Sequence, residues 1–436
     1  MYLVCNVLHI RYITFYITFL FVTSSYHFHL VCEKCGSVYY PEEPVNLCKK
    51  CGSPLEVQYD NMDSLDGESF FSSAKSNTLQ SIWKYKLLLP HPIRNENIIS
   101  LGEGSGNLIY LKNISIQTGL KIYARYYGFN PTGTHKDIGM SVAVSMAKEL
   151  GVTSAITFST GNAGTSLSAY CSAAGIKTTI ITRDTISKEK LSNILALGAT
   201  VIVINDLDDP WSLLNDLSKF MQVYYFTNFI NPFRAEGHKT LAYDIFTEIG
   251  NTPIAIYEPL GTGGGIWGSW KGFRELRDMD LTDEIPRINA VQPEAVKHAV
   301  VAYENGKKTA TAYGDGNMTK IQSLADSVPL FGDERPLKAI YDSHGKAIAV
   351  TDEETKTALL ILGKDGLFVE PAAACSLAGL LKDINEGTYD KGDAIVLSLT
   401  GTGLKQPDFS LDAVSKNIIT MKSPDVTSLK NYIKSG

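Results

Sequence analysis

A lysine at the junction of a turn and a predicted helix is the residue best suited to chemistry in this chain. Turn formers at residues 130–133 end any element that arrives from upstream. Apolar residues then recur at helical spacing from Ile138 to Leu150, and Gly151 ends the run. Lys136 therefore lies in a first helical turn, where the helix dipole and burial disfavour a protonated amine. Because a neutral amine can attack an aldehyde, we interpret Lys136 as the covalent anchor of a cofactor; an ordinary surface lysine is the alternative.

A run of glycines downstream is suited to binding a phosphate group. Residues 261–265, Gly-Thr-Gly-Gly-Gly, follow a predicted strand over 254–257 and precede a predicted helix over 266–276. Glycines allow consecutive backbone N–H groups to converge on one phosphate, and the start of a helix adds a favourable dipole. We therefore expect this run to hold the phosphate of the cofactor. A nucleotide loop or a plain turn is the alternative, although no Lys-Ser or Lys-Thr pair follows and the spacing is not that of a dinucleotide fingerprint.

Four of the seven cysteines form paired Cys-x-x-Cys knuckles, each followed by a glycine. These are Cys32, Cys35, Cys48 and Cys51. Each knuckle turns a pair of thiolates toward one point, so the four predict a closed, structural Zn²⁺ site in a ribbon over 32–59; a ribbon that has lost its metal is the alternative. Cys171 and Cys375 lie in alanine-rich helical runs, where we expect packed, unreactive thiols and a reducing, cytoplasmic environment.

The composition favours a globular protein with more than one domain. The chain has 436 residues, of which 44% are hydrophobic and 20% charged, as is typical of folded proteins. This length exceeds a usual single core, so we expect two α/β domains and a small appendage. The net charge of -6 provides no basic field for a polyanion, so nucleic acid is not an expected partner.

The first 31 residues differ in character from the rest. Residues 12–22 form an apolar run behind Arg11, which superficially suits a signal peptide but is too short to span a bilayer comfortably. Secretion does not suit a zinc ribbon followed by a cofactor enzyme. We expect a start site assigned too far upstream, with the working protein beginning near Leu30 or Val31; a membrane anchor is the alternative.

Strand and helix patterns alternate from residue 121 onward. The predicted strands lie at 155–158, 178–182, 200–204, 254–257 and 394–399, and the predicted helices at 163–174, 188–197, 353–362 and 372–381. Such alternation predicts parallel strands with covering helices. Ligands of such sheets bind beyond the carboxyl ends of the strands, so the glycine-rich motifs that follow the strands are expected to meet around one cofactor.

Further motifs follow Lys136 in order. Residues 159–164 read Ser-Thr-Gly-Asn-Ala-Gly, residues 370–371 Glu-Pro, and residues 399–405 Leu-Thr-Gly-Thr-Gly-Leu-Lys. With the lysine turn and the glycine run, these motifs resemble the fold-type-II pyridoxal-phosphate (PLP) enzymes, and most closely the threonine synthases, over about residues 31–408. The resemblance implies two open, twisted sheets of the parallel type with helices on both faces, behind a small zinc ribbon. We expect a leader at 1–31, the ribbon at 32–59, a larger PLP-binding α/β domain at 60–137 and 228–436, and a smaller α/β domain at 138–227.

The resemblance gives each motif a task. Lys136 would carry the PLP aldehyde and later move a proton, Asn162 would bond the ring's 3-oxygen, and Thr400 would place a hydroxyl at the pyridine nitrogen. A hydroxyl cannot protonate that nitrogen as a carboxylate would, which favours elimination and replacement over transamination. Glu370 would support the ring. The cofactor-binding residues are Lys136, Asn162, Gly261, Thr262, Gly263, Gly264, Gly265 and Thr400; the substrate-binding residues are Ser159, Thr160, Gly161, Asn228 and Arg234.

The implied reaction converts O-phospho-L-homoserine and water into threonine and phosphate. Arg234 and Asn228 match the stretch that grips the substrate phosphate. The chain departs from the family at four positions. Phe229 replaces the usual serine, and Tyr127 replaces the usual glutamate. His135 replaces the usual phenylalanine or glutamine, and Ile138 replaces the usual arginine. These departures leave PLP binding intact and bear on the identity of the substrate.

Other activities remain as alternatives. The same scaffold supports threonine or serine dehydratases and the β-replacements of cysteine or cysteate synthesis. A zinc-ribbon binding module on a catalytically inactive scaffold is a further alternative. We expect a small-molecule amino-acid substrate and a homodimer, with no nucleic-acid or membrane partner.

Overall fold

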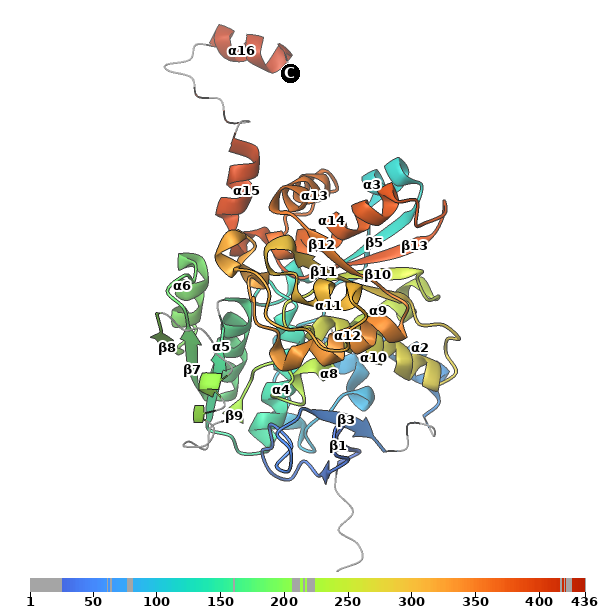
Figure 1. Ribbon diagram of the computed structural model, residues 1–436, viewed down its shortest axis with the longest axis vertical. Coiled ribbons are helices and arrows are strands. Elements are labelled where there is room, and N and C mark those ends of the chain that lie inside the picture. The colour runs from blue at the N-terminus through green and yellow to red at the C-terminus, as the bar shows by residue number, and fades with distance from the viewer. Residues whose placement is uncertain are drawn as a thin grey trace, which may run out of the picture.

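The computed structural model describes residues 26–435 apart from 61, 63–64, 77–80, 160, 206–211, 215, 218–223, 416–417, 419 and 421–425. Its named strands form sheets of three, six and four strands (Figure 1). The α/β architecture predicted from the sequence is confirmed. The apolar run of the predicted leader lies outside the described residues. None of the helices in the described part of the chain has the length and apolarity needed to cross a bilayer.

The six-stranded sheet has the order β12-β11-β10-β13-β5-β4, and all its neighbours are parallel except β4 and β5. Its register pairs Leu399, the last residue of β13, with Tyr126, the last of β5. Both strands therefore deliver the residues that follow them to the same edge. The strands are β4 (Ile109–Tyr110), β5 (Lys121–Tyr126), β10 (Ala255–Pro259), β11 (Arg287–Pro293), β12 (Ala347–Val350) and β13 (Ala394–Leu399).

Helices cover both faces of this sheet. Along β10, Ala255 and Tyr257 belong to one hydrophobic core with α14, whereas Ile256 between them belongs to the other core with α10 and α12. This alternation follows from the pleat of a strand whose two faces are both buried. The helices around this sheet are α2 (Gly67–Ser76), α3 (Lys112–Thr118), α8 (Arg234–His238), α9 (Thr240–Ile249), α10 (Gly264–Asp278), α11 (His298–Glu304), α12 (Glu334–Asp342), α13 (Asp352–Lys364), α14 (Pro371–Asn385) and α15 (Pro407–Val414). A last helix, α16 (Val426–Ser435), lies apart from the body in Figure 1.

The four-stranded sheet is parallel throughout, with the order β8-β7-β6-β9. All of its strands come from the segment predicted as the smaller domain. The strands are β6 (Ser154–Phe158), β7 (Lys177–Thr182), β8 (Thr200–Val203) and β9 (Tyr224–Tyr225), and the helices beside them are α4 (Lys136–Glu149), α5 (Asn162–Ala174) and α6 (Lys188–Ala196). β9 was not predicted, and the bounds of the other elements differ from the predicted ones by a few residues at most.

The cysteine ribbon is a three-stranded antiparallel sheet of order β2-β1-β3. Its strands are β1 (Phe28–Cys32), β2 (Val38–Tyr39) and β3 (Leu55–Tyr59). β1 begins at Phe28, before the predicted boundary at residue 31. Phe28 is fully buried, and its ring centroid lies 6.0 Å from that of Phe233. The ribbon thus packs directly on the segment that leads into α8.

Candidate active site

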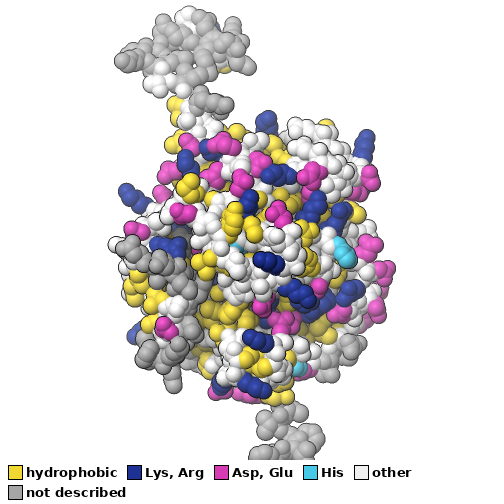
Figure 2. All heavy atoms as spheres, viewed as in Figure 1, with side chains coloured by type: hydrophobic (Ala, Val, Ile, Leu, Met, Phe, Trp, Pro, Cys, Tyr) yellow, Lys and Arg dark blue, Asp and Glu magenta, His cyan; other side chains and the backbone are white. Residues whose placement is uncertain are grey.

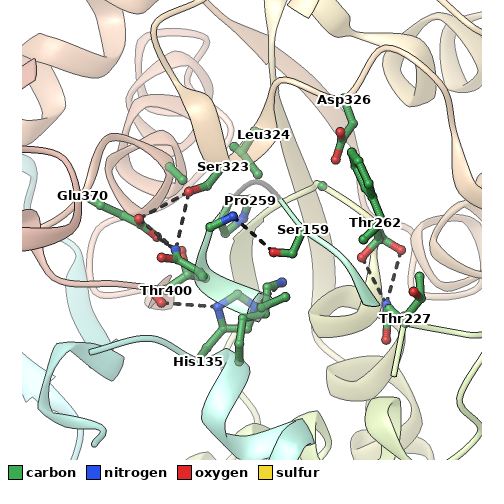
Figure 3. Close-up of a pocket in the computed structure, with 18 of the residues that line it drawn as sticks. His135, Ser159, Thr227, Pro259, Thr262, Ser323, Leu324, Asp326, Glu370 and Thr400 are labelled. Carbon is green, nitrogen blue, oxygen red and sulfur yellow. Dashed lines mark hydrogen bonds between the residues drawn. The ribbon is translucent and has the colours of Figure 1, made fainter. Parts of the chain in front are cut away.

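Strands of both parallel sheets end at one cavity of about 790 Å³, its open mouth included. β6 leads into it through Ser159 and Gly161, β10 through Pro259, Gly261 and Thr262, and β13 through Thr400. Figure 3 shows Glu370 and Ser323 on one side of this cavity and Thr262 and Thr227 on the other. The predicted site residues that line it are Lys136, Ser159, Gly161, Asn162, Asn228, Arg234, Gly261, Thr262 and Thr400.

Lys136 is the first residue of α4, as the sequence predicts. Burial and, second, the nearby Arg234 guanidinium lower the pKa of the Lys136 amine to about 7. Carboxylates act in the opposite direction, because their negative charge favours the ammonium form; they belong to Glu370, Asp326 and Glu258. A large share of the amine is therefore neutral near neutral pH.

His135 lies beside this amine and is held by the loop that follows β13. Its Nε2 is 3.0 Å from Lys136 Nζ, and its Nδ1 is 3.2 Å from the carbonyl oxygen of Thr400. The backbone N–H of His135 donates to the same carbonyl at 2.9 Å. Burial, and next the positive charge of Lys136, hold the pKa of His135 well below its usual value, so the imidazole is neutral.

The glycine run forms the loop and first turn that open α10. Gly263 has φ +77° and precedes the helix, a conformation that favours glycine. An added Cβ on Gly264 would lie 2.3 Å from Asn228 Nδ2, so a larger residue would displace Asn228. Asn228 Nδ2 itself donates to Thr262 Oγ1 at 3.3 Å. Gly263, Gly264 and Gly265 build this turn but do not line the cavity.

Asn162 and Glu370 join the starts of two helices across the cavity. Asn162 is the first residue of α5, and Glu370 precedes α14, whose first residue is Pro371. Asn162 Nδ2 lies 2.8 and 2.9 Å from the two carboxylate oxygens of Glu370. Ser323 Oγ also contacts this carboxylate at 3.4 Å. The amide of Asn162 is therefore oriented by Glu370, and its Oδ1 is the atom left without a partner in the described part of the chain.

A cationic subsite lies at the end of the cavity nearest α8. Arg234 begins α8 and donates from Nη1 to the carbonyl of Phe226 at 2.9 Å, while its Nε has no partner among the described residues. Phe229, where the family commonly has serine, does not line the cavity; its ring is buried and lies under Arg335 at 5.2 Å. Thr227 lines the cavity beside Asn228, and its hydroxyl lies 3.3 Å from that of Thr157.

Some predicted residues were not placed, and some lining residues were not predicted. Thr160 lies outside the described residues. Thr227, Ser323 and Asp326 line the cavity without having been assigned a role. Ser323 and Asp326 both lie in an aperiodic segment of the sequence. Glu258 was also missed: it is buried at the end of β10, and burial raises the pKa of its carboxyl to about 7.

The cavity fits a phosphorylated aldehyde with a polar ring. Its lining includes a largely neutral lysine amine, backbone of a glycine loop at a helix start, and buried polar atoms on different walls without partners in the described structure. These atoms are Asn162 Oδ1, Asn228 Oδ1 and Arg234 Nε. Buried polar groups are normally satisfied, so these point to a polar ligand.

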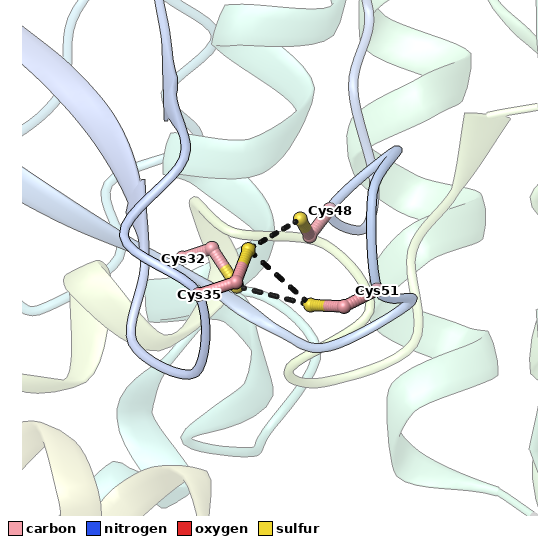
Figure 4. A group of neighbouring side chains, drawn as sticks. All are labelled: Cys32, Cys35, Cys48 and Cys51. Atoms are coloured by element: carbon pink, nitrogen blue, oxygen red, sulfur yellow. Dashed lines mark hydrogen bonds between the residues drawn. The ribbon is translucent and has the colours of Figure 1, made fainter.

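The sulfur atoms of Cys32, Cys35, Cys48 and Cys51 all lie within 4.8 Å of one another (Figure 4). The shortest pairs are 3.4 to 3.5 Å apart. The knuckles match each other: Gly36 N–H donates to Cys32 O and Gly52 N–H to Cys48 O, both at 2.8 Å. The glycines have φ +69° and +71°, which the turns require. This donor set fits a tetrahedral metal site. Cys171 and Cys375 are fully buried elsewhere, as predicted.

These features define an α/β protein whose buried lysine and glycine loop, at the carboxyl edge of its parallel strands, suit a phosphorylated carbonyl cofactor. A family model described as "pyridoxal-phosphate dependent enzyme" matches residues 99–401. The threonine synthase of Methanocaldococcus jannaschii is 36% identical over 412 residues, which cover 92% of this chain and 98% of the relative. That of Methanosarcina acetivorans is 33% identical over 88% of this chain and 94% of the relative. The chain belongs to the PLP-dependent enzymes and, within them, to the threonine synthase family.

Solved structures with low sequence identity share the fold. The processed form of threonine deaminase isoform 2 from Solanum lycopersicum superposes with a TM-score of 0.61 at 16% identity, covering 86% of this chain and 97% of that chain. Maize serine racemase has a TM-score of 0.59 at 15% identity, covering 75% of this chain and 91% of that chain. At such identities the likeness concerns the fold alone.

Proposed function

We propose that this cavity converts O-phospho-L-homoserine and water into L-threonine and phosphate. The observation that carries the proposal is the meeting, in one cavity, of a largely neutral lysine amine with a buried arginine and asparagine: Lys136, Arg234 and Asn228. The reaction needs an amine that can bind an aldehyde and a cationic subsite for the substrate phosphate. The similarity to threonine synthases over most of the chain supports the same conclusion.

PLP, when bound, supplies an electron sink for the substrate. Lys136 would hold the cofactor covalently before the substrate arrives. Once released, its amine would remove the proton at the substrate's α-carbon and return a proton later in the reaction. Burial serves both tasks, because it leaves a large share of the amine neutral near pH 7 and keeps water away from the proton that the amine transfers.

The other walls would hold the cofactor in place. Backbone N–H groups of the loop from Gly261 to Gly265, at the start of α10, would bind its phosphate. Asn162 would lie beside the ring oxygen, with Glu370 fixing the orientation of its amide. Thr400 would place its hydroxyl at the ring nitrogen, where a hydroxyl leaves the electron sink weaker than a carboxylate would.

The substrate would be held at both of its anionic ends. The turn over 159–161, at the carboxyl end of β6, would donate N–H groups to the substrate carboxylate. Arg234 and Asn228 would bind the substrate phosphate, with the Thr227 hydroxyl supplying the contact that Phe229 does not make. This arrangement favours a phosphorylated substrate over threonine or serine.

The test is product analysis with the purified, PLP-loaded protein. We expect O-phospho-L-homoserine to yield threonine and inorganic phosphate in equal amounts. Formation of a keto acid from threonine, without turnover of phosphohomoserine, would instead identify a dehydratase. A protein that stays colourless with PLP and is not modified on borohydride treatment would identify the inactive scaffold.

We also propose that the cysteine cluster binds a structural Zn²⁺. Four convergent sulfur atoms on matched knuckles support this assignment, and metal analysis of the purified protein would test it, with one zinc per chain expected. Reduced ribbon cysteines and an amino-acid substrate suit a cytoplasmic enzyme. The homodimer and the division into domains at 60–137 with 228–436 and at 138–227 are parts of the same proposal, testable by solution mass measurement and limited proteolysis.

A further inference from the structure

Within the described residues, His135 is the only residue whose side chain makes a hydrogen-bonding contact with Lys136 Nζ. Its Nε2 lies 3.0 Å from that nitrogen. The ring is fixed by other contacts. Its Nδ1 is 3.2 Å from Thr400 O, and its centroid lies 5.1 Å from that of His238 and 6.1 Å from that of Tyr127. His135 is therefore oriented by β13, α8 and the segment after β5 at once.

The direction of the hydrogen bond to Lys136 follows from these contacts. A carbonyl oxygen can only accept, so the Nδ1 of His135 carries the hydrogen directed at Thr400. A neutral imidazole has one N–H, so Nε2 presents a lone pair toward Lys136 Nζ. The lysine is thus the donor and the histidine the acceptor.

The acceptor also has an electrostatic consequence. An acceptor that contacts the amine favours its ammonium form, because the bond to a charged donor is the stronger one. His135 therefore works against burial and against the Arg234 guanidinium, which both favour the neutral amine. The remaining charged or titratable groups around the pair are His238 on α8, Glu370 before α14, Glu258 on β10 and Asp326 after residues 322–324.

We propose that His135 is a positioning residue for Lys136: its Nε2 accepts a hydrogen bond from the lysine amine and fixes the place from which that amine takes up and returns protons. This inference rests on the proposed role of Lys136 as the proton carrier. The acceptor in this chain is a ring that the Thr400 carbonyl holds in place.

The test uses the apoprotein, so its result does not depend on which amino acid the enzyme converts. Reductive methylation with formaldehyde and a borane is measured across neutral pH, and the Lys136 peptide is quantified by mass spectrometry. In the unsubstituted protein the methylation rate should rise through a midpoint near pH 7. The exposed Lys308, in the same digest, reports any general change in reagent reactivity.

The variants separate the hydrogen bond from the bulk of the side chain. His135→Gln keeps an acceptor and should keep the midpoint, whereas His135→Phe should lower it by about one pKa unit, the effect of one hydrogen bond to a charged group. The amide of His135→Asn is too short to reach Nζ, so the midpoint of this variant should fall as far as that of His135→Phe. His135→Asn serves as the test if His135→Phe fails to fold.

The PLP-loaded enzyme gives a second readout. His135→Phe should lower kcat about tenfold with KM little changed, because the lost bond orients a reacting amine and holds no substrate. An unchanged midpoint in the phenylalanine and asparagine variants, or a glutamine midpoint shifted as far as theirs, would overturn the proposal. If the methylation midpoints shift as expected but no threonine is formed, the proposed function is wrong. The contact between His135 and Lys136 is then still supported by the shift in the midpoint.

Discussion

Lys271 in the middle of α10 donates a 2.6 Å hydrogen bond to the carbonyl oxygen of Val57 in the cysteine ribbon. The same ammonium lies 2.6 Å from Glu236 Oε1, and Tyr59 of the ribbon donates to Glu236 Oε2 at 2.9 Å. α10 begins at the glycine loop, and α8 carries both Glu236 and Arg234. The ribbon therefore contacts both α10, which follows the glycine loop, and α8, which carries Arg234.

Removing the proposed Zn²⁺ from the ribbon should weaken the cavity as well as the ribbon. We expect a zinc chelator or Cys48→Ser to lower the melting temperature and the affinity for PLP together, since β3 would no longer support α10. Cys171→Ala, a buried cysteine outside the cluster, should keep its zinc and its PLP affinity. Thermal melts and PLP titrations of the same samples measure both effects; unchanged PLP affinity after complete zinc loss would contradict the coupling.

The buried ion pair beneath this contact should also be sensitive to substitution. Lys271→Met removes the cation and leaves Glu236 with one fewer buried partner, which costs about 3–5 kcal/mol of unfolding free energy. Lys338→Met, at an exposed ion pair on α12, should cost less than about 1 kcal/mol. Denaturant unfolding measures both; equal losses would show that the ribbon contact does not stabilise the fold.

The contact between Asn162 and Glu370 should control cofactor affinity. Glu370→Gln replaces one accepting oxygen by a donor, so the amide of Asn162 loses its fixed orientation, and we expect PLP to dissociate about tenfold more readily, as for one charge-assisted hydrogen bond. Glu386→Gln, at the other end of α14, should bind PLP normally. Equilibrium titration by visible absorbance measures the change.

The activity should depend on pH through Lys136 and Glu258. Because only the neutral amine can take up a proton once the substrate has released it, kcat should rise as the pH increases through about 7. The Glu258 carboxylate favours the ammonium form, so Glu258→Gln should lower the pKa of Lys136 and move this acid limb toward lower pH by about half a unit. An acid limb that moves toward higher pH in Glu258→Gln would contradict this expectation.

The Thr227 hydroxyl should contribute to phosphate recognition. Thr227→Val is expected to raise KM for the phosphorylated substrate about tenfold with kcat little changed, as for a lost hydrogen bond to a charged group. Thr355→Val, buried between α13 and α14, is the matched control and should retain the normal KM. Steady-state kinetics separate the two constants.

Much of this arrangement could be predicted from local signals in the sequence. The turn before Lys136, the glycine run and the cysteine knuckles each require particular residue types at fixed spacing, and each lies where the sequence placed it. Ser323 and Asp326 could not be assigned, because they reach the cavity from aperiodic chain whose path is set by packing. The contacts of His135 were equally hidden, since the Thr400 carbonyl that orients it is supplied by a strand distant in sequence.

The central claim is that Lys136 holds the PLP aldehyde, and the most direct measurement compares the unsubstituted protein with Lys136→Ala. Both are loaded with PLP and treated with borohydride, and the mass of the peptide that contains position 136 is determined. We expect visible absorbance and a pyridoxyl-phosphate adduct on Lys136 in the unsubstituted protein, with both lost in the variant. An adduct on another lysine, or absorbance that persists in the alanine variant, would contradict it.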